Sequence, residues 1–407
     1  MTSVRSRSLR SLTLSIALLP GCGDRGRSPH ESVAVRDSAG IEIVENRVAL
    51  DELPEWRPGE PELRIGTLEG DPEYQLYRVR DATRLPDGRI VVVNSGTAEV
   101  RVYEPDGTFA LSFGGEGEGP EGFGDIRGVD VVGDSLLAFD ARSSRVSTWS
   151  TDGELLGSVT LSAPVGRLTG HAWLGGGLLL LDTPFDMVPE VGETIWWRLL
   201  VHRYARDGTL RDTIVEYPAM HLVRLSYDRG DGIMLSAFHF TPMAKVAAVS
   251  DRVFGTDASD REIEVLTSSG ELRRLIRWTG PVLAVEDGDY ETYRDEVLTA
   301  LEDPESREET RDRLDRTPAE PAYPGLQDLG VAPDGSLWVR RYDRPGGAPG
   351  QRWLVFDTEG RLEGRVWLPD GLELHDVGHD YLIGVETDEL DVEYVALYGF
   401  HPPWFGR

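Results

Sequence analysis

The stretch VRVYEPDGTFALSFG, Val100–Gly114, decides the fold, because its pattern returns four more times along the chain. Two runs with alternating apolar residues flank Pro105-Asp106-Gly107. Glycine supplies the positive φ angle that a tight turn between antiparallel strands needs, so the stretch predicts a β-hairpin. Hairpins of the same design are predicted around four later glycines: Gly153, Gly208, Gly270 and Gly360.

A second hairpin pattern precedes each of these five. The upstream patterns cover residues 81–93, 128–139, 171–181, 244–255 and 329–339. Two hairpins make four antiparallel strands, which is one blade of a β-propeller. A sixth unit begins at Leu374 and has room for three strands only. We therefore expect a strand from the N-terminal region, either 41–44 or 62–66, to complete the last blade and close the ring.

The predicted fold class is all-β: a six-bladed β-propeller of four-stranded antiparallel blades over residues 41–407. The segments 88–94, 100–103 and 117–123 (GRIVVVN, VRVY and GEGPEGF) resemble the NHL repeat. From about residue 41 onward, the chain resembles the bacterial six-bladed β-propeller lipoproteins related to that repeat. NHL-like propellers serve as enzymes, scaffolds and ligand binders, so the resemblance implies a fold and leaves the function open.

The N-terminal segment has the features of an export signal. Three arginines precede the apolar run 12–19, which is too short to span a bilayer. The sequence LPGC at 19–22 then resembles a bacterial lipobox, although Pro20 stands where a small residue is usual. The alternative is an ordinary signal peptide followed by a chance cysteine. Cys22 is the only cysteine of the chain, so a disulfide cannot explain it.

We therefore predict a lipoprotein signal peptide over residues 1–21, lipidation of Cys22 and a flexible tether over 22–40. The protein is expected to be exported and attached to a membrane only through its lipid. An acidic retention signal does not follow Cys22, since the next residue is Gly23. The outer membrane is therefore the expected location, with the protein facing the periplasm or the cell surface.

The charge of the chain argues against nucleic acid as a partner. Asp and Glu number 71 against 42 Lys and Arg, for a formal net charge of −29, and Lys245 is the only lysine. Such an acidic surface repels phosphate backbones. We expect a monomer whose partner is an envelope protein, a peptide or a glycan.

One segment interrupts the strand pattern between the fourth and fifth blades. Within 287–316, Tyr293, Val297, Leu298 and Leu301 recur at helical spacing among charged residues. This pattern predicts one or two amphipathic helices with a break at Asp303-Pro304. Placed where an outer strand leads to the next inner strand, the insertion would cover one mouth of the central channel; the alternative is that it packs beside the ring.

Candidate site residues follow from alignment of the innermost strands, whose first residues line one mouth of a propeller channel. One predicted column contains Asp81, Arg127, Thr169, Ala244, Asp328 and Glu373; a second, two residues further on, contains Thr83, His171, Val246 and His375. Acids, arginine and histidine in such a ring suit a polar ligand, although channel walls are also polar because water fills them. The candidate ligand-binding residues are Asp81, Arg127, His171, Asp328, Glu373 and His375.

The leading functional hypothesis is a binding or scaffolding module that uses the channel mouth and the insertion. The alternative is a metal-assisted hydrolase or lyase. No cofactor is evident, but His171 and His375 are candidate ligands of a divalent metal, because histidine and carboxylate suit zinc and similar ions. Trp196-Trp197 is a further candidate, either as an exposed aromatic patch for a sugar or protein or as packing between blades.

Overall fold

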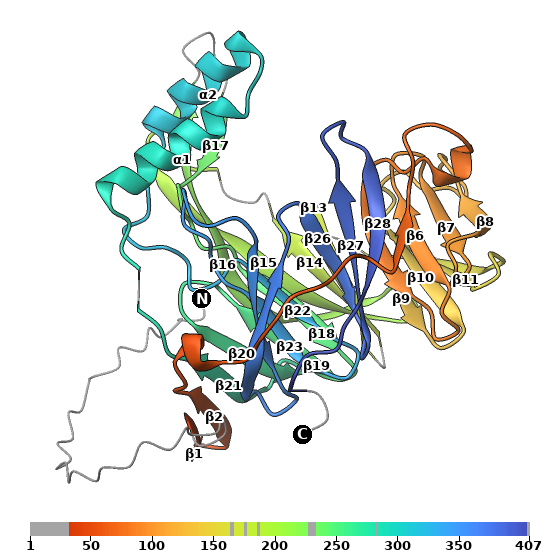
Figure 1. The fold of residues 1–407 in the computed structure, drawn as a ribbon, viewed down its shortest axis with the longest axis horizontal. Helices are drawn as coiled ribbons and strands as arrows, with labels where there is room; N and C mark the ends of the chain where they lie inside the picture. Colours follow the sequence, from red (N-terminus) through yellow and green to blue (C-terminus); the bar gives the residue numbers. More distant parts are fainter. Residues whose placement is uncertain are drawn as a thin grey trace.

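The computed structural model describes residues 32–162, 167–174, 177–184, 188–226, 233–281 and 283–404. Within these residues, strands form six sheets that follow one another along the chain, and we number the sheets I to VI in that order (Figure 1). The protein is therefore mostly β, with four-stranded antiparallel sheets, as a β-propeller requires. No helix in this part of the chain is long and apolar enough to cross a membrane.

Sheets I and II contain four strands each. Sheet I consists of β5 (Val79–Arg84), β6 (Ile90–Asn94), β7 (Glu99–Tyr103) and β8 (Phe109–Gly114). Sheet II consists of β9 (Ile126–Val132), β10 (Ser135–Asp140), β11 (Arg145–Ser150) and β12 (Leu155–Thr160). All neighbouring strands in both sheets pair antiparallel.

Sheet III is larger than the sequence pattern predicts. It consists of β13 (Arg167–Leu174), β14 (Gly177–Thr183), β15 (Thr194–Ala205), β16 (Leu210–Ser226) and β17 (Ile233–Ala237). The β15–β16 hairpin pairs from Tyr204 and Leu210 as far as Thr194 and Val223, and β17 then pairs with the far end of β16. The outer part of this sheet thus extends beyond an ordinary blade and provides a surface for the helices.

Sheets IV to VI use the remaining strands of the chain. Sheet IV contains β18 (Lys245–Val249), β19 (Arg252–Thr256), β20 (Glu262–Thr267) and β21 (Leu272–Trp278). Sheet V contains β22 (Asp328–Val331), β23 (Leu337–Arg340), β24 (Gln351–Phe356) and β25 (Leu362–Leu368). Sheet VI contains β26 (Leu372–Val377), β27 (Tyr381–Thr387) and β28 (Glu393–Gly399).

The five predicted hairpin turns are confirmed. Their glycines all adopt φ angles between 79° and 84°, in the left-handed region that residues with a Cβ rarely adopt: Gly107, Gly153, Gly208, Gly270 and Gly360. At Gly208 an added Cβ would also lie 2.4 Å from the Thr160 carbonyl oxygen of the preceding sheet. The turn pattern in the sequence therefore reflects both backbone conformation and close packing.

The N-terminal segment runs along the outer edges of three sheets before it enters sheet I. Its strands are β1 (Val33–Ser38), β2 (Ile41–Asn46), β3 (Glu55–Trp56) and β4 (Leu63–Ile65), with short 3-10 helices at Leu50–Glu52 and Pro72–Tyr74. β2 pairs parallel with β21, β3 pairs parallel with β25, and β4 pairs antiparallel with β28. Of the two candidate segments, it is thus 62–66 that supplies the strand of sheet VI. The segment covers edges that would otherwise expose unpaired backbone groups.

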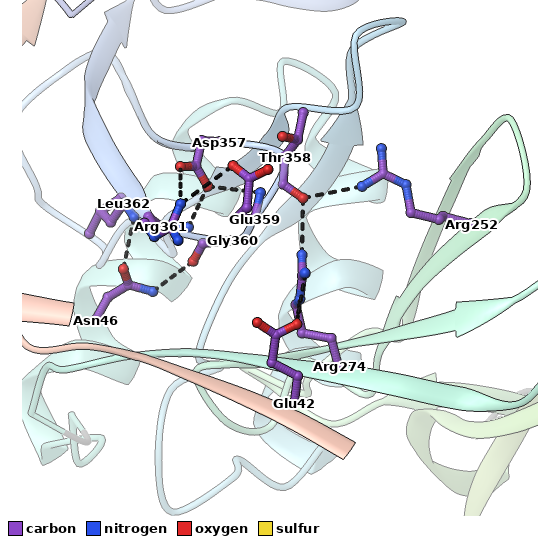
Figure 2. Close-up of polar contacts among 10 residues, drawn as sticks. All are labelled: Glu42, Asn46, Arg252, Arg274, Asp357, Thr358, Glu359, Gly360, Arg361 and Leu362. Carbon is purple, nitrogen blue, oxygen red and sulfur yellow. Dashed lines mark hydrogen bonds and ion pairs between the residues drawn. The ribbon is translucent and has the colours of Figure 1, made fainter. Parts of the chain in front are cut away.

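The Asn46 side chain joins this segment to sheets IV and V through hydrogen bonds (Figure 2). Its amide nitrogen donates to the Arg277 and Gly360 carbonyl oxygens, both at 3.0 Å, and its oxygen accepts from the Leu362 backbone at 2.8 Å. Asn46 is only 1% exposed, and these three hydrogen bonds satisfy both the nitrogen and the oxygen of its buried amide. Nearby, the Arg274 guanidinium binds the Glu42 carboxylate at 2.8 Å.

Hydrophobic clusters join the sheets in sequence, each lying between one sheet and the next. The cluster around Phe113, Phe123 and Trp149 joins I to II, and the cluster around Trp278 and Phe356 joins IV to V. A cluster that includes Val92 and Ile383 joins VI back to I. The other three clusters join II to III, III to IV and V to VI. The first strands of the sheets also lie side by side, with β5 against both β9 and β26.

Two helices lie between β21 and β22: α1 (Asp287–Thr299) and α2 (Pro304–Arg316). Pro304 occupies the first turn of α2, and the Asp303 carboxylate caps it by accepting from the Ser306 backbone at 2.7 Å. Figure 1 shows both helices beside β17, at the upper left and away from sheets I and II. The helices therefore pack on the extension of sheet III.

Candidate functional site

The structure brings together three of the predicted site residues, at the junction of sheets VI and I. His375 Nδ1 lies 3.8 Å from the Asp81 carboxylate, and His375 Nε2 lies 4.0 Å from the Glu373 carboxylate. The His375 side chain is only 7% exposed, whereas the Glu373 side chain is 75% exposed. His375 is therefore a buried histidine between one partly buried and one solvent-exposed carboxylate.

Asp376, which the sequence analysis did not select, forms the center of this region. Its Oδ2 atom accepts hydrogen bonds from the Thr83 hydroxyl at 3.0 Å, the Arg84 backbone at 2.9 Å and the Tyr381 hydroxyl at 2.9 Å. Asp81 extends the network, because its carboxylate accepts from the Val129 backbone of β9 at 2.9 Å. We define Asp81, Thr83, His375, Asp376 and Tyr381 as the β5–β26 junction.

Burial and charge shift the pKa values of this junction in specific directions. Burial alone would lower the pKa of His375, but the carboxylates of Asp81, Glu373 and Asp376 raise it above its ordinary value. Burial raises the pKa of Asp376, against the effect of its three hydrogen-bond donors. The junction thus favours a protonated imidazole beside Asp81.

β-Bulges explain why the predicted columns do not match the structure throughout. The pairing of four innermost strands skips one residue each: Arg80, Arg127, Thr169 and His375. A bulge inserts an unpaired residue and changes the direction of its side chain. Arg127 and His375 are thus bulge residues, whereas Asp81, Glu373 and Asp328 occupy paired positions.

The remaining predicted residues lie elsewhere or outside the described residues. The Arg127 guanidinium binds the Asp125 carboxylate at 2.6 Å, and the Asp328 carboxylate binds Lys245 Nζ at 3.3 Å. His171 belongs to β13, but its side chain is not among those described, so its role beside His375 stays a prediction. Cys22, the predicted lipidation site, also lies outside the described residues.

The geometry at His375 does not fit a metal center made by these three residues. A metal ion binds one nitrogen of an imidazole ring, but the two carboxylates lie near different nitrogens. One ion therefore could not bind the ring and both carboxylates together. Among the described residues, no group of three or more His, Cys, Asp or Glu side chains is arranged to hold a metal ion.

A separate pocket of about 270 Å³ lies where the helices meet the entrances to β18 and β22. We call it the insertion pocket. It is lined by the loop after β17, by one residue from each helix and by the chain around β22: Ala237, Phe238, His239, Phe240, Thr241, Met243, Tyr293, Arg313, Pro324, Leu326, Gln327 and Tyr342. Met243 and Gln327 precede the first residues of β18 and β22, so the pocket adjoins the innermost strands of sheets IV and V.

Packing of aromatic rings positions the pocket wall. The His239 ring lies 5.0 Å from Tyr290 and 5.5 Å from Tyr293 between ring centroids, and Phe240 lies 5.4 Å from Tyr293. The buried His239 Nε2 donates to the Leu314 carbonyl oxygen at 3.0 Å. Burial lowers the pKa of His239, so a neutral imidazole fixes the loop after β17 to α2. His239 therefore has a structural role in the pocket wall.

Unlike His239, four other polar side chains of the pocket have no hydrogen-bond or ion-pair partner among the described residues. Within the described part of the chain, the Arg313 guanidinium, the Gln327 amide and the hydroxyls of Tyr293 and Tyr342 have no hydrogen-bond or ion-pair partner. Burial raises the pKa of Tyr342 to about 12, so its hydroxyl remains a hydrogen-bond donor. The pocket wall thus combines aromatic surfaces with one cation and several polar groups that a ligand could satisfy.

Trp196 and Trp197 have different environments, which the sequence could not separate. Trp196 is 40% exposed and stacks on His221 with centroids 4.6 Å apart, and His221 stacks on the pocket residue Phe238 at 3.7 Å. Trp197 instead donates its indole N–H to the Pro184 carbonyl oxygen at 2.7 Å. Trp196 therefore begins an aromatic stack that leads to the insertion pocket, while Trp197 helps to hold the start of β15.

Comparisons with known proteins identify distant structural likenesses only. No family model matches the chain, and no curated protein matches its sequence. A Bacteroides fragilis protein that carries the name exported protein is 12% identical, with 85% of this chain and 98% of that chain covered and a TM-score of 0.47. Virginiamycin B lyase from Staphylococcus aureus is 10% identical, with coverage of 83% and 98% and a TM-score of 0.39.

Regucalcin, a calcium-binding protein from Agrobacterium tumefaciens, is also 10% identical, with 86% of this chain and 99% of that chain covered and a TM-score of 0.38. All three TM-scores are below 0.5. The strand pairing and the hydrophobic clusters between the sheets therefore define the fold.

Proposed function

We propose that this protein is an exported, lipid-anchored, six-bladed β-propeller that binds a ligand of the cell envelope in the insertion pocket. The ligand is part of an envelope protein, a peptide or a glycan, and it presents a ring together with a negatively charged group. The observation that carries the proposal is the insertion pocket itself, where aromatic surfaces surround several polar groups, Arg313, Gln327, Tyr293 and Tyr342, that have no hydrogen-bond or ion-pair partner in the part of the chain that the structure describes.

The propeller part of the proposal is supported by the order of the contacts. Six sheets follow one another along the chain, and a hydrophobic cluster lies between each sheet and the next, including VI and I. Pairing of β4 with β28 gives sheet VI its fourth strand and ties the two ends of the ring together. The helices then form an insertion between the fourth and fifth blades.

The export part of the proposal is supported by the sequence. The basic start, the short apolar run and the LPGC motif at 19–22 are typical of a lipoprotein signal. Metabolic labelling with a palmitate analogue tests it: we expect label in the full chain and none in Cys22→Ser. Equal labelling of the two proteins would remove the anchor from the proposal.

The ligand chemistry follows from the composition of the pocket wall. The described lining residues include Arg313 but no Asp or Glu, although the whole chain carries 71 acidic and 42 basic residues. An arginine without a carboxylate partner favours an anionic group, and the aromatic residues favour an apolar or sugar ring. The charge of Arg313 and the aromatic lining together therefore favour a ring-bearing acid over a neutral ligand.

The test uses two probes with the same ring and different charge. We expect 2-naphthoate to bind the full chain in isothermal titration and 2-naphthalenemethanol to bind at least about tenfold more weakly. Arg313→Gln should remove most of the difference between the probes, and Tyr293→Ala should weaken both. The matched control is Arg311→Gln, because Arg311 is exposed on the same helix and does not line the pocket.

Two results would count against the proposal. If neither probe binds the wild-type protein, the insertion pocket is not a ligand site. If both bind and the pocket variants change nothing, the ligand site lies elsewhere, and the channel residues near His375 become the next candidates.

The second candidate function is the metal-assisted hydrolase or lyase. It is favoured only by the proximity of His375 to Asp81 and Glu373, and the two carboxylates lie near different ring nitrogens. It therefore requires the side chain of His171 as a further ligand. Elemental analysis of the purified protein, with His171→Ala and His375→Ala variants, tests it: a stoichiometric ion lost in both variants would favour this function.

A further inference from the structure

Five arginines gather on the outer part of sheet V, in a chain whose net charge is −29. They come from β23, β24, β25 and the segments that flank β3 and β23: Arg57, Arg340, Arg341, Arg352 and Arg365. We call them the arginine cluster. Its ion pairs, within the described part of the chain, use only two carboxylates, those of Glu55 and Asp343.

Each of these carboxylates is shared between two guanidinium groups. Glu55 binds Arg57 at 2.8 Å and Arg365 at 3.6 Å. Asp343 binds Arg352 at 2.5 Å and Arg340 at 3.7 Å. Four arginines therefore have ion-pair partners, and among the described residues neither carboxylate forms an ion pair with a fifth, although the charge of Asp343 acts on Arg341 from a distance.

Arg341 is that fifth arginine. Among the described residues its guanidinium has no hydrogen-bond or ion-pair partner, and only its backbone N–H is bonded, to the Arg352 carbonyl oxygen at 2.8 Å. Arg341 is half-buried and lines a cavity of about 30 Å³ together with Arg352, Arg365 and Trp367. One carboxylate, that of Glu55, also lines the cavity, and Arg57 and Arg365 already bind it. Burial, and then the nearby charge of Arg352, lower the pKa of Arg341.

Such an arrangement is costly without a further negative charge. Arginine does not lose its proton at physiological pH, so the cluster cannot relieve repulsion by becoming neutral. A partly buried charge without a partner also loses much of its hydration. Both costs disappear if an anion occupies the cavity between the guanidinium groups.

We infer that the cavity beside Arg341 is a binding site for a small free oxyanion, inorganic phosphate or sulfate. Guanidinium groups present planar pairs of N–H donors that match the oxygens of such ions. The guanidinium N–H groups of Arg341 would donate hydrogen bonds to the anion. Arg352 and Arg365, which also line the cavity, would contribute positive charge. This site is independent of the insertion pocket, because the two share no lining residue.

Isothermal titration of the full chain with inorganic phosphate at low ionic strength tests the inference, with sodium chloride at equal ionic strength as the blank. We expect saturable binding that Arg341→Met weakens at least about tenfold. Arg341→Lys, which keeps the charge but loses the planar donor pair, should bind with intermediate affinity. The control Arg311→Met removes an exposed arginine of α2 and should bind within about twofold of the wild type.

Unfolding midpoints provide a second readout that also reports whether the variant folds. Phosphate should raise the midpoint of the wild type by about 2–4 °C and leave that of Arg341→Met unchanged. In buffer without phosphate or sulfate, Arg341→Met should be at least as stable as the wild type, because it removes an unpaired charge. Absence of saturable phosphate and sulfate binding, or equal binding by Arg341→Met, would overturn the inference.

Discussion

The β5–β26 junction and the insertion pocket are both rich in polar side chains, but their hydrogen bonding differs. At the junction, one Asp376 oxygen accepts from three donors, and Asp81 accepts from the next sheet. In the insertion pocket, Arg313 and the Tyr293 and Tyr342 hydroxyls have no partner among the described residues. Polar groups that bond to one another stabilise a fold, whereas polar groups around a cavity that lack protein partners are free to bond to water or to a ligand.

The comparison assigns different roles to residues that look similar in the sequence. Histidines occur in both regions, yet His375 lies among carboxylates that raise its pKa, and burial lowers the pKa of His239. The first favours a charged and the second a neutral imidazole. In the proposed function, the ligand site is therefore defined by Arg313 and the two tyrosines of the insertion pocket and not by either histidine.

The largest expected effect is at Asp376. Asp376→Leu leaves the Thr83 hydroxyl, the Arg84 N–H and the Tyr381 hydroxyl without their acceptor, so we expect the unfolding free energy to fall by about 3–5 kcal/mol. Asp376→Asn keeps an acceptor oxygen and should cost clearly less. Urea unfolding measures both; an Asp376→Leu protein as stable as the wild type would show that the junction does not hold the sheets together.

A smaller loss is expected at Asn46, which joins the N-terminal segment to sheets IV and V. Asn46→Ala removes three hydrogen bonds at a buried position and should lower the unfolding free energy by about 2–3 kcal/mol. Its neighbour Arg47 has a side chain that is 61% exposed, so Arg47→Ala should change stability by less than about 0.5 kcal/mol. Equal effects of the two substitutions would contradict the fastening role of Asn46.

The pH dependence of the unfolding free energy measures how much the protonated form of His375 contributes to stability. Its folded-state pKa is raised, so the pairing with Asp81, Glu373 and Asp376 contributes stability below the ordinary histidine pKa and loses it as pH rises through the folded pKa. The stability difference between wild type and His375→Gln should therefore be larger at about pH 6 than at about pH 9. Urea unfolding at both pH values measures it, and a difference that grows with pH contradicts the assignment.

The smallest expected effect on stability is in the insertion pocket. Among the described residues Arg313 has no hydrogen-bond or ion-pair partner to lose, so Arg313→Gln should change the unfolding free energy by less than about 0.5 kcal/mol. Thermal and urea unfolding of the variant check this. A loss of about 2 kcal/mol or more would indicate that Arg313 is part of the packing and not reserved for a ligand.

The sequence predicts the strands well because their turns depend on local chemistry. Each hairpin needs a residue with positive φ, and the five glycines that mark the repeat adopt that conformation. Sheet III was only partly predictable. Nothing in the stretch 210–226 marks the extension of β16 beyond the blade, because this extension depends on pairing with Thr194–Trp197 and β17.

The candidate site was less predictable for two physical reasons. Bulges at Arg127 and His375 shift the strand register by one residue, and residue spacing alone does not reveal them. The insertion pocket combines segments that are distant in the sequence, around residues 240, 293, 313 and 342, and only packing brings these together. One signal was available: Phe238-His239-Phe240 is unusually aromatic for a segment that connects two sheets.

The most direct test of the central claim measures 2-naphthoate affinity and unfolding free energy side by side for Arg313→Gln and Asp376→Asn. The account predicts that Arg313→Gln loses affinity at unchanged stability, and that Asp376→Asn loses stability at unchanged affinity. If instead Asp376→Asn abolishes binding while Arg313→Gln binds like the wild type, the ligand site lies at the β5–β26 junction and the assignment of the insertion pocket is wrong.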